Sequence, residues 1–316
     1  MWKKKDIDQA IKYFEKALTL DDKNKTALRS LSMIIRTKEA ATEEEKLNVA
    51  QKSIDYAKKA IHLDMKDSTS WYVLGNAYFY KAFIDKTQYK DLSTALSSYN
   101  MSQQKIIKYQ NPDLYYNRGV VHAYLENYDK AYEDFMNANA IDTSLKSEDI
   151  CKNIVDTVST IFKLVRNQCG LKPKNLAQIV TSIPCNLRDD VNYTLANVQK
   201  LEEGENKGKI ITGKIIQSAS SCFEVPICLV VVDYEGLFMG LSLYNISKDF
   251  LSTIKYKSSS FIILNPFLKK IKMVLQDNKT LEYPCIQVND LQCFLVDGKY
   301  CSSYASSPTL NSTFFN

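Results

Sequence analysis

The sequence has no long apolar run and only two histidines. Its longest purely apolar stretch is Ile227–Val232, far short of the roughly 20 residues that a membrane-spanning helix needs. The charged start, Met1–Asp6, has no apolar segment behind it and is not a secretory signal. We expect both histidines, His62 and His122, to be structural, and no two cysteines have metal-ligand spacing. The sequence therefore predicts no membrane segment, no metal site and no cofactor.

Motifs of enzymes are absent as well. The segment Gly204–Gly213 resembles a phosphate-binding loop only superficially, because it lacks Gly-Lys-Ser/Thr before a helix and precedes a strand. No serine lies in a nucleophile elbow, so we expect a protein that is not an enzyme. The net charge of +5 does not require nucleic acid, and eight cysteines without an export signal favour reduced thiols. Arginine supplies only 5 of the 41 basic residues, and its planar fork of donors gives each one particular weight.

The N-terminal half carries a repeated helical pattern, and 316 residues are enough for about two domains. Gly119 is followed by Ala131, Phe135 and Ala138 at the spacing of positions 8, 20, 24 and 27 of the 34-residue tetratricopeptide repeat. Small residues at three of these positions let two antiparallel helices approach closely. The same frame fits three earlier units through Trp71, Leu74, Gly75 and Tyr78, through Leu28, Leu31, Ser32 and Ile35, and through Ala10, Phe14 and Ala17. Stacked hairpins of this kind predict a solenoid with a concave surface.

The repeats depart from the ideal length at three places. Nine extra residues lie around Ala40–Lys46, where Thr42-Glu43-Glu44-Glu45 is a capping signal for a longer helix, and eight lie near Asp85–Tyr89. Met1 falls at position 11 of the first unit, so we expect either a sequence that is truncated at its N-terminus or a chain that begins within a solenoid.

After the repeats the apolar period changes. Glu148–Arg166 has one apolar stripe and is predicted to cap the solenoid, and Leu171–Lys174 is a short basic linker to a helix that ends near Ser182. Short segments rich in Ile, Val, Leu and Tyr predict strands at Lys209–Gln217, Ile227–Asp233, Leu237–Tyr244, Phe261–Leu264, Ile271–Gln276, Leu281–Val288 and Gln292–Val296, with a helix at Ser247–Lys255. This order favours a small oligonucleotide/oligosaccharide-binding (OB) barrel, with a β-sandwich as the alternative.

The predicted fold class is α+β with several domains. We expect an all-α tetratricopeptide superhelix over 1–147, a capping helix and basic linker over 148–184, an all-β OB-fold-like barrel over 185–300 and a disordered tail over 301–316.

The concave surface is the predicted binding site for a short peptide. Repeat positions place on it Arg29, Met33, Arg36, Tyr72, Asn76, Phe79, Tyr80, Asp113, Tyr116, Asn117 and Tyr124. Arg36 can bind a carboxylate with two hydrogen bonds, Asp113 can take a basic side chain, and asparagines can bond to a peptide backbone. The alternative is a solvated polar face. Arg118 lies at a packing position, so both a structural and a binding role stay open for it.

Several segments resemble the tetratricopeptide repeat protein 5 (Strap) family. They are Ser30–Arg36, Ser70–Asn76, Asn111–Leu114 with Asn117 and Arg118, and Lys172-Pro173-Lys174. The resemblance runs from Met1 to about Val296, interrupted near Asp189–Glu205. It implies a repeat array followed by an OB-fold domain. The family has further repeats upstream, which agrees with a start inside the solenoid.

The resemblance also implies a function in tubulin autoregulation. The family binds the N-terminal Met-Arg-Glu of nascent tubulin at the ribosome and recruits an adaptor for mRNA decay. Arg36 and Asp113 match its peptide-binding residues, Lys172 and Lys174 match lysines that contact ribosomal RNA, and Glu148 stands one place beyond the position of a family acid. An alternative implied role is a nuclear transcription cofactor that binds acetyltransferase coactivators and actin-regulating proteins. We therefore expect cytoplasmic and nuclear localisation. Nucleic-acid binding through the barrel needs exposed aromatic and basic residues, for which Phe238 and Tyr244 are candidates, although strand alternation could equally place both in the core.

Overall fold

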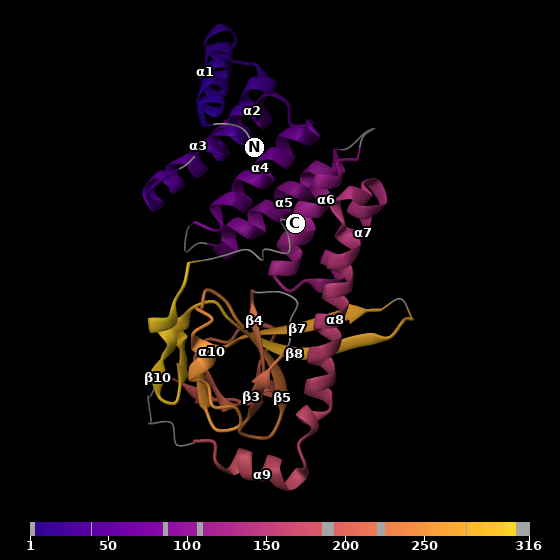
Figure 1. The fold of residues 1–316 in the computed structure, drawn as a ribbon, viewed down its shortest axis with the longest axis vertical. Helices are drawn as coiled ribbons and strands as arrows, with labels where there is room; N and C mark the ends of the chain where they lie inside the picture. Colours follow the sequence, from indigo (N-terminus) through magenta and orange to yellow (C-terminus); the bar gives the residue numbers. More distant parts are fainter. Residues whose placement is uncertain are drawn as a thin grey trace. The chain divides into compact units, whose positions relative to one another are not determined.

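The chain divides into two compact units. The computed structural model describes residues 4–38, 40–84, 88–105, 110–184, 193–219, 225–275 and 277–307 (Figure 1). One unit comprises Met1–Val121 and Glu133–Ser147, and the other comprises His122–Tyr132 and Glu148–Asn316. The segment 122–132 lies inside the predicted repeat region, yet it belongs to the same unit as the β-strands.

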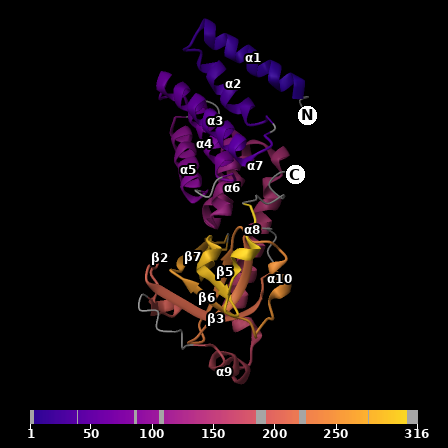
Figure 2. The same cartoon turned by 90° about the vertical axis from the view of Figure 1, so that its left-hand side faces the viewer.

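The regular structure described within residues 4–181 is helical, as the repeat spacing predicts. The helices are α1 (Lys4–Leu20), α2 (Lys25–Ile35), α3 (Glu43–Leu63), α4 (Ser68–Lys81), α5 (Gln88–Gln104), α6 (Pro112–Tyr124), α7 (Tyr128–Ile141), α8 (Ser147–Arg166) and α9 (Pro173–Thr181). Figure 2 shows α1 to α5 stacked one after another in chain order. None of the helices in the described ranges is both long and apolar enough to cross a membrane.

The predicted capping signal starts α3. The Thr42 hydroxyl accepts a hydrogen bond from the Glu45 N–H at 3.1 Å, and the Glu45 carboxylate accepts one in return from the Thr42 N–H. This capping box extends α3 into the first insertion. The second insertion lies partly outside the described residues, and α5 begins within it at Gln88.

Close approach between helices explains the glycine at position 8 of the third unit. A Cβ on Gly75 would lie 2.5 Å from Tyr99 Cε1, and the Tyr99 side chain is fully buried. A Cβ on the equivalent Gly119 would lie 3.2 Å from the nearest atoms of the Phe135 ring. The ring at position 24 therefore rests directly on the glycine.

We expect Gly75→Ala to destabilise the repeats by about 1–3 kcal/mol, because the added methyl group must displace the buried Tyr99 ring. Gly119→Ala is the matched control and is expected to cost less, since Phe135 needs to move by only a few tenths of an ångström. Urea unfolding followed by circular dichroism measures both variants. Equal losses would contradict the close approach at Gly75.

The strands of the second unit form one sheet. They are β1 (Thr194–Leu195), β2 (Gly204–Glu205), β3 (Lys209–Ser218), β4 (Ile227–Asp233), β5 (Phe238–Leu243), β6 (Ser260–Leu264), β7 (Phe267–Val274), β8 (Thr280–Val288), β9 (Phe294–Val296) and β10 (Lys299–Tyr300). β4 has the predicted bounds. β7 begins at Phe267 instead of Ile271, and the helix expected at Ser247–Lys255 is the single turn α10 (Phe250–Thr253).

A long, interrupted segment closes this sheet into a barrel. β3, β4, β5, β8 and β7 are neighbours in that order, and β6 pairs with the other side of β3. β6 ends at Leu264 and β7 begins at Phe267, so the two strands are halves of one segment broken at Asn265 and Pro266. Because this segment joins both ends of the sheet, the described strands close into a ring, from which the far part of the β7–β8 hairpin extends. The interior is packed with aliphatic and aromatic residues such as Ile211, Leu229, Leu241, Phe261 and Ile286.

The segment after 300 is ordered up to residue 307. Cys301–Tyr304 forms a 3₁₀ turn, Ala305 bridges to Ile246, and the Ser306 N–H donates to the Asn245 carbonyl at 2.8 Å. The expectation of a disordered tail from 301 is therefore wrong for these residues. Buried Cys301, which is 2% exposed, anchors the turn in the barrel core. The rest of the predicted tail lies outside the described residues.

Candidate functional site

The first helices of three successive repeats bring polar side chains together around Tyr72. We call Arg36, Tyr72, Asn76, Tyr80, Asp113 and Asn117 the Tyr72 cluster. The Asn117 amide donates to the Tyr72 hydroxyl at 3.2 Å and to Asn76 Oδ1 at 3.0 Å. The Tyr99 hydroxyl donates a hydrogen bond to the same Asn76 oxygen at 2.7 Å. Asn76 is therefore held in one orientation by α5 and α6.

Arg36 lies within this cluster with its charge unpaired. Its Nη1 donates to the Asn76 carbonyl at 2.8 Å and its Nε to the Ser32 carbonyl at 3.1 Å. Burial lowers the pKa of Arg36 below its usual value, while Tyr99, Tyr72 and Tyr80 act in the opposite direction. No described carboxylate forms an ion pair with this guanidinium, so the site presents a fixed positive charge.

Asp113 supplies the opposite charge next to the same tyrosine. Burial raises the pKa of the Tyr72 hydroxyl, the negative charge of Asp113 raises it further, and the positive charge of Arg36 lowers it. Both charges therefore act on one hydroxyl group. Asp113 is exposed, and its side chain has no ion pair with a described residue. The two residues predicted to hold a charged peptide thus act on the pKa of the Tyr72 hydroxyl in opposite directions.

The local sequence fixes where Asp113 lies. Asn111 precedes α6, and its Oδ1 accepts a hydrogen bond from the Asp113 N–H at 3.1 Å. Pro112 occupies the first helical position, where a missing N–H costs nothing. The Asn-Pro-Asp sequence therefore places the carboxylate in the first turn of α6.

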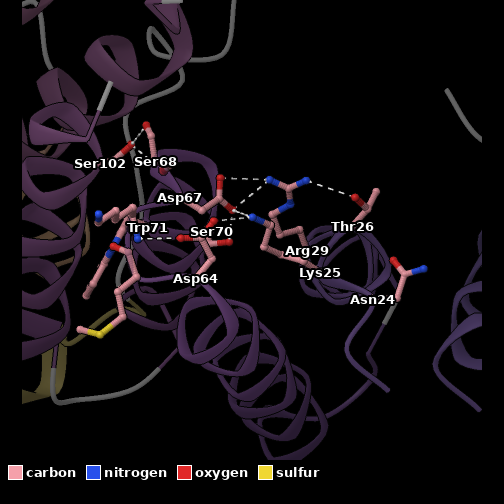
Figure 3. A network of polar contacts seen from close by, with 12 residues as sticks. Asn24, Lys25, Thr26, Arg29, Asp64, Asp67, Ser68, Ser70, Trp71 and Ser102 are labelled. Carbon is pink, nitrogen blue, oxygen red and sulfur yellow. Dashed lines mark hydrogen bonds and ion pairs between the residues drawn. The ribbon is translucent and has the colours of Figure 1, made fainter. Parts of the chain in front are cut away.

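Arg29 has a different role from the one predicted. Its Nη1 lies 3.0 Å from Asp67 Oδ2, and Lys25 Nζ lies 2.7 Å from Asp64 Oδ2 (Figure 3). Ser70 also bonds to Asp67, which begins α4. Because the guanidinium is already paired with a half-buried carboxylate, Arg29 joins α2 to the start of α4 and is not a free ligand for a peptide.

Arg118 is a structural residue, which settles the question left open by the sequence. It is 7% exposed, and Nε and Nη2 donate to the two carboxylate oxygens of Asp134 at 2.8 and 2.6 Å. Its Nη1 donates to Asn100 Oδ1 at 2.9 Å and to Gln103 Oε1 at 2.6 Å. The inclusion of Arg118 among the peptide-binding residues is therefore wrong.

The remaining predicted residues divide between surface and core. Met33 is 41% exposed, whereas Tyr116 is half-buried and packs edge-on against Phe135 with ring centroids 5.5 Å apart. Tyr80 is half-buried near Arg36, and Phe79 packs on Phe83. Tyr124 is only 2% exposed and packs against Tyr244, so its placement on the concave surface is wrong.

Lys172 and Lys174 are both exposed at the start of α9. Lys172 is the residue before the helix, and Pro173 is its first residue. The prediction that they contact ribosomal RNA stays a prediction. Among the described residues no cluster of metal-ligating side chains occurs. Of the two histidines expected to be structural, His122 is buried, whereas His62 is exposed in the last turn of α3.

The barrel face that OB-fold proteins use for oligonucleotides is covered. OB-fold proteins bind oligonucleotides on the second and third strands of the barrel. Here β1 and β2 are only two residues long and β3 is the first barrel strand, so the second and third barrel strands are β4 and β5. Every residue of β5 is buried, as is every residue of β4 after Ile227. Phe238 is 7% and Tyr244 is 1% exposed, so of the two alternatives for these residues the buried one is correct, and neither offers a ring on which a base could stack.

Part of what covers this face is the turn after α6. The Glu126 carboxylate accepts hydrogen bonds from the Ser242 hydroxyl at 2.7 Å, from the Tyr244 hydroxyl at 3.1 Å and from the Gln287 amide. The Lys269 ammonium group donates to the Leu125 carbonyl and to Asn127 Oδ1 at 2.6 Å. The contacts of Glu126 were not predicted from the sequence, because an acid in a hairpin turn is usually solvated. The hydrogen bond of the Tyr99 hydroxyl was not predicted either, since position 24 of the repeat predicts only packing.

Stacked repeat hairpins with a polar cluster on their first helices, followed by a closed OB barrel, define a tetratricopeptide repeat adaptor for protein interactions. A tetratricopeptide repeat profile matches residues 2–24 and 112–144, and a profile of the tetratricopeptide repeat protein 5 OB fold domain matches 192–309. The chain belongs to the tetratricopeptide repeat protein 5 family. The predicted fold class and the family resemblance are therefore confirmed.

Individual relatives support this assignment. Tetratricopeptide repeat protein 5 of Homo sapiens is 29% identical and that of Mus musculus is 30% identical, each across 94% of this chain and 70% of the relative. Among solved structures, the crystal structure of MamA is 21% identical across 48% of this chain and 79% of its own. The TM-score of this match is 0.38.

Proposed function

We propose that this adaptor binds the N-terminal peptide of nascent tubulin at the ribosome and promotes decay of tubulin mRNA. The observation that carries the proposal is that two opposite charges come from the residues that meet around Tyr72. Arg36 donates to the Asn76 carbonyl, and Asp113 lies one helical turn before Asn117, which bonds to both Asn76 and Tyr72. A Met-Arg-Glu start carries both charge signs on adjacent residues. Its glutamate complements the guanidinium, and its arginine complements the carboxylate.

The asparagines of the cluster support binding of an extended backbone. Asn76 and Asn117 are half-buried, and each has both a donor and an acceptor group. Because Tyr99 and Tyr72 already orient these amides, little side-chain entropy is lost when a peptide binds.

Arg36→Ala is expected to weaken binding of a Met-Arg-Glu-Ile peptide about tenfold to a hundredfold, because a charge-assisted contact contributes roughly 1.5–3 kcal/mol. Arg29→Ala is the matched control. This variant also removes an arginine, but the guanidinium of Arg29 is already paired with Asp67. The affinity of Arg29→Ala for the peptide is therefore expected to stay within a few-fold of the wild type. Calorimetric titration of the full chain measures all three proteins. Equal affinity of Arg36→Ala and wild type would refute the proposed site.

The ribosome contact has its own test. Lys172 and Lys174 are exposed, and neither forms an ion pair with a described acidic residue. Both ammonium groups are therefore available to phosphates. Binding to ribosomes should decrease when both lysines are replaced by glutamate, while peptide affinity should not change.

A further inference from the structure

The hairpin of β7 and β8 leaves the barrel with one edge unpaired among the described residues. β7 and β8 stay paired out to Val274 and Thr280. β2, however, covers the outer edge of β7 only at Phe267 and Leu268. From Lys269 onward, β7 therefore has β8 on one side and no described strand on the other.

Pro284 identifies the backbone groups that face this edge. Pro284 lies opposite Lys270 and has no N–H, so the two cannot form a hydrogen-bonded antiparallel pair. Their N–H and C=O groups must then point away from each other. Because the pattern alternates along a strand, Lys272 and Val274 also point their backbone groups away from β8. The outward groups of β7 thus belong to Lys270, Lys272 and Val274.

A hydrogen bond at the end of the hairpin agrees with this assignment. The Leu275 N–H donates to the Lys279 carbonyl at 2.9 Å, so by alternation the backbone groups of Val274, Lys272 and Lys270 point away from the other half of the hairpin. The side chains of these three residues share the solvated face, since Lys270 and Lys272 are exposed and Val274 is 55% exposed, whereas Ile271 and Met273 are 1% and 2% exposed.

A pocket lies beside the same edge. Its volume is about 420 Å³, and the apolar side chains that line it include Val198, Leu201, Leu268 and Pro284. Lys270 and Glu282 form its charged part. Leu268 and Lys270 are two residues apart and point to the same face of β7. A strand added at this edge would therefore direct alternate side chains toward the pocket and toward Lys272.

We propose that the free edge of β7 binds an extended acidic peptide by strand addition, with one apolar side chain in the pocket. Strand addition gives affinity through backbone hydrogen bonds and specificity through alternate side chains. The charge of the partner follows from Lys270 and Lys272, neither of which forms an ion pair with a described residue. An acidic residue on the same face of the added strand would meet them across the strand pair.

This surface lies in the second unit and shares no residue with the Tyr72 cluster. It would give the adaptor a binding site for a second protein, independent of the proposed tubulin peptide. Edge lysines also protect strands from aggregation. That role needs no partner, and the experiment must separate it from docking.

The test uses the ¹⁵N-labelled full chain and the synthetic peptide acetyl-Leu-Thr-Glu-Thr-Asp-Thr-amide. Its leucine, glutamate and aspartate share one face of an extended strand. We expect the amides of Lys270, Lys272 and Val274 to shift and to exchange more slowly with solvent. The same peptide with lysine in place of both acids should leave these amides unchanged.

Two variants decide between docking and protection. Lys272→Pro removes an outward N–H and spares the bonds to β8, and we expect it to weaken binding at least about tenfold, the loss of one to two backbone hydrogen bonds. Lys272→Gln keeps the N–H and should lose only a few-fold. If the proline disturbs folding, reversing both charges with Lys270→Glu and Lys272→Glu should switch the preference to the basic peptide. Unshifted edge amides, or an unchanged preference after charge reversal, would show that the lysines only protect the edge.

Discussion

Replacing Glu126 by alanine is expected to lower the free energy of unfolding of the second unit by about 3–5 kcal/mol, because buried donors lose a charged acceptor. Glu126 is 2% exposed, and Ser242, Tyr244 and Gln287 all donate to its carboxylate. The alanine leaves these groups facing an empty space that is too enclosed for bulk water.

Two controls separate the hydrogen bonds from backbone strain. Glu126 has a left-handed backbone with φ of 56°, which costs a non-glycine residue about 1–2 kcal/mol. Glu126→Gly relieves that strain and should therefore lose less than Glu126→Ala. Ser242→Ala removes one donor together with its hydrogen bond and should cost about 1 kcal/mol.

Hydrogen exchange of the amides of β4, β5 and β8 localises the effect to this unit. Faster exchange in these strands, with α2 to α4 unchanged, is the expected pattern. If Glu126→Ala were as stable as wild type, the carboxylate would not be what secures the turn on the sheet.

Arg118→Ala is expected to destabilise the first unit by about 3–5 kcal/mol, because it leaves the Asp134 carboxylate buried without its partner. Burial already raises the pKa of Asp134, and the hydrogen bonds and charge of Arg118 lower it. Asn100 and Gln103 lose a donor as well. Arg118→Lys keeps the charge but not the two-pronged geometry, so it should recover only part of the loss.

The dependence on pH gives this prediction a signature. Without Arg118, the pKa of Asp134 in the folded chain rises further above its unfolded value. Such a group stabilises the fold only while protonated, so the penalty of Arg118→Ala should shrink as pH falls toward the unfolded pKa of about 4. Replacing both Arg118 and Asp134 by leucine should cost less than Arg118→Ala alone. Denaturant unfolding across a pH series tests both statements, and a penalty independent of pH would contradict the buried-charge explanation.

The repeat array could be predicted because its signals are local. Gly75, Ala95 and Tyr99 recur at fixed spacing, and Thr42 with Glu45 marks a helix start in four residues. β4 was predicted to the residue because a continuous apolar run ends at a turn. The predicted start of β7, Ile271, lies four residues after its observed start, because Lys269 and Lys270 interrupt the apolar pattern. Lys269 is half-buried only because the turn after α6 supplies oxygen atoms for its ammonium group.

The candidate site was predictable in outline but not in detail. Repeat positions placed Arg36, Asn76 and Asn117 correctly enough to meet around Tyr72. They could not show which arginines are already paired, because Asp67 and Asp134 reach Arg29 and Arg118 from other helices. Likewise, the burial of Tyr244 depends on a contact 120 residues away in the sequence, which no local pattern reveals.

The division of the chain has a consequence for how this protein can be cut or recombined. The backbone passes from one unit to the other after Val121, after Tyr132 and again after Ser147. A fragment that begins at residue 148 therefore lacks the carboxylate that three barrel side chains require. Exchange of the last repeat for another copy would remove that carboxylate too, unless the copy also carried an acid at its turn. The repeat array and the barrel are thus not interchangeable modules, and a border drawn from the order of helices and strands alone would cut through a folded unit.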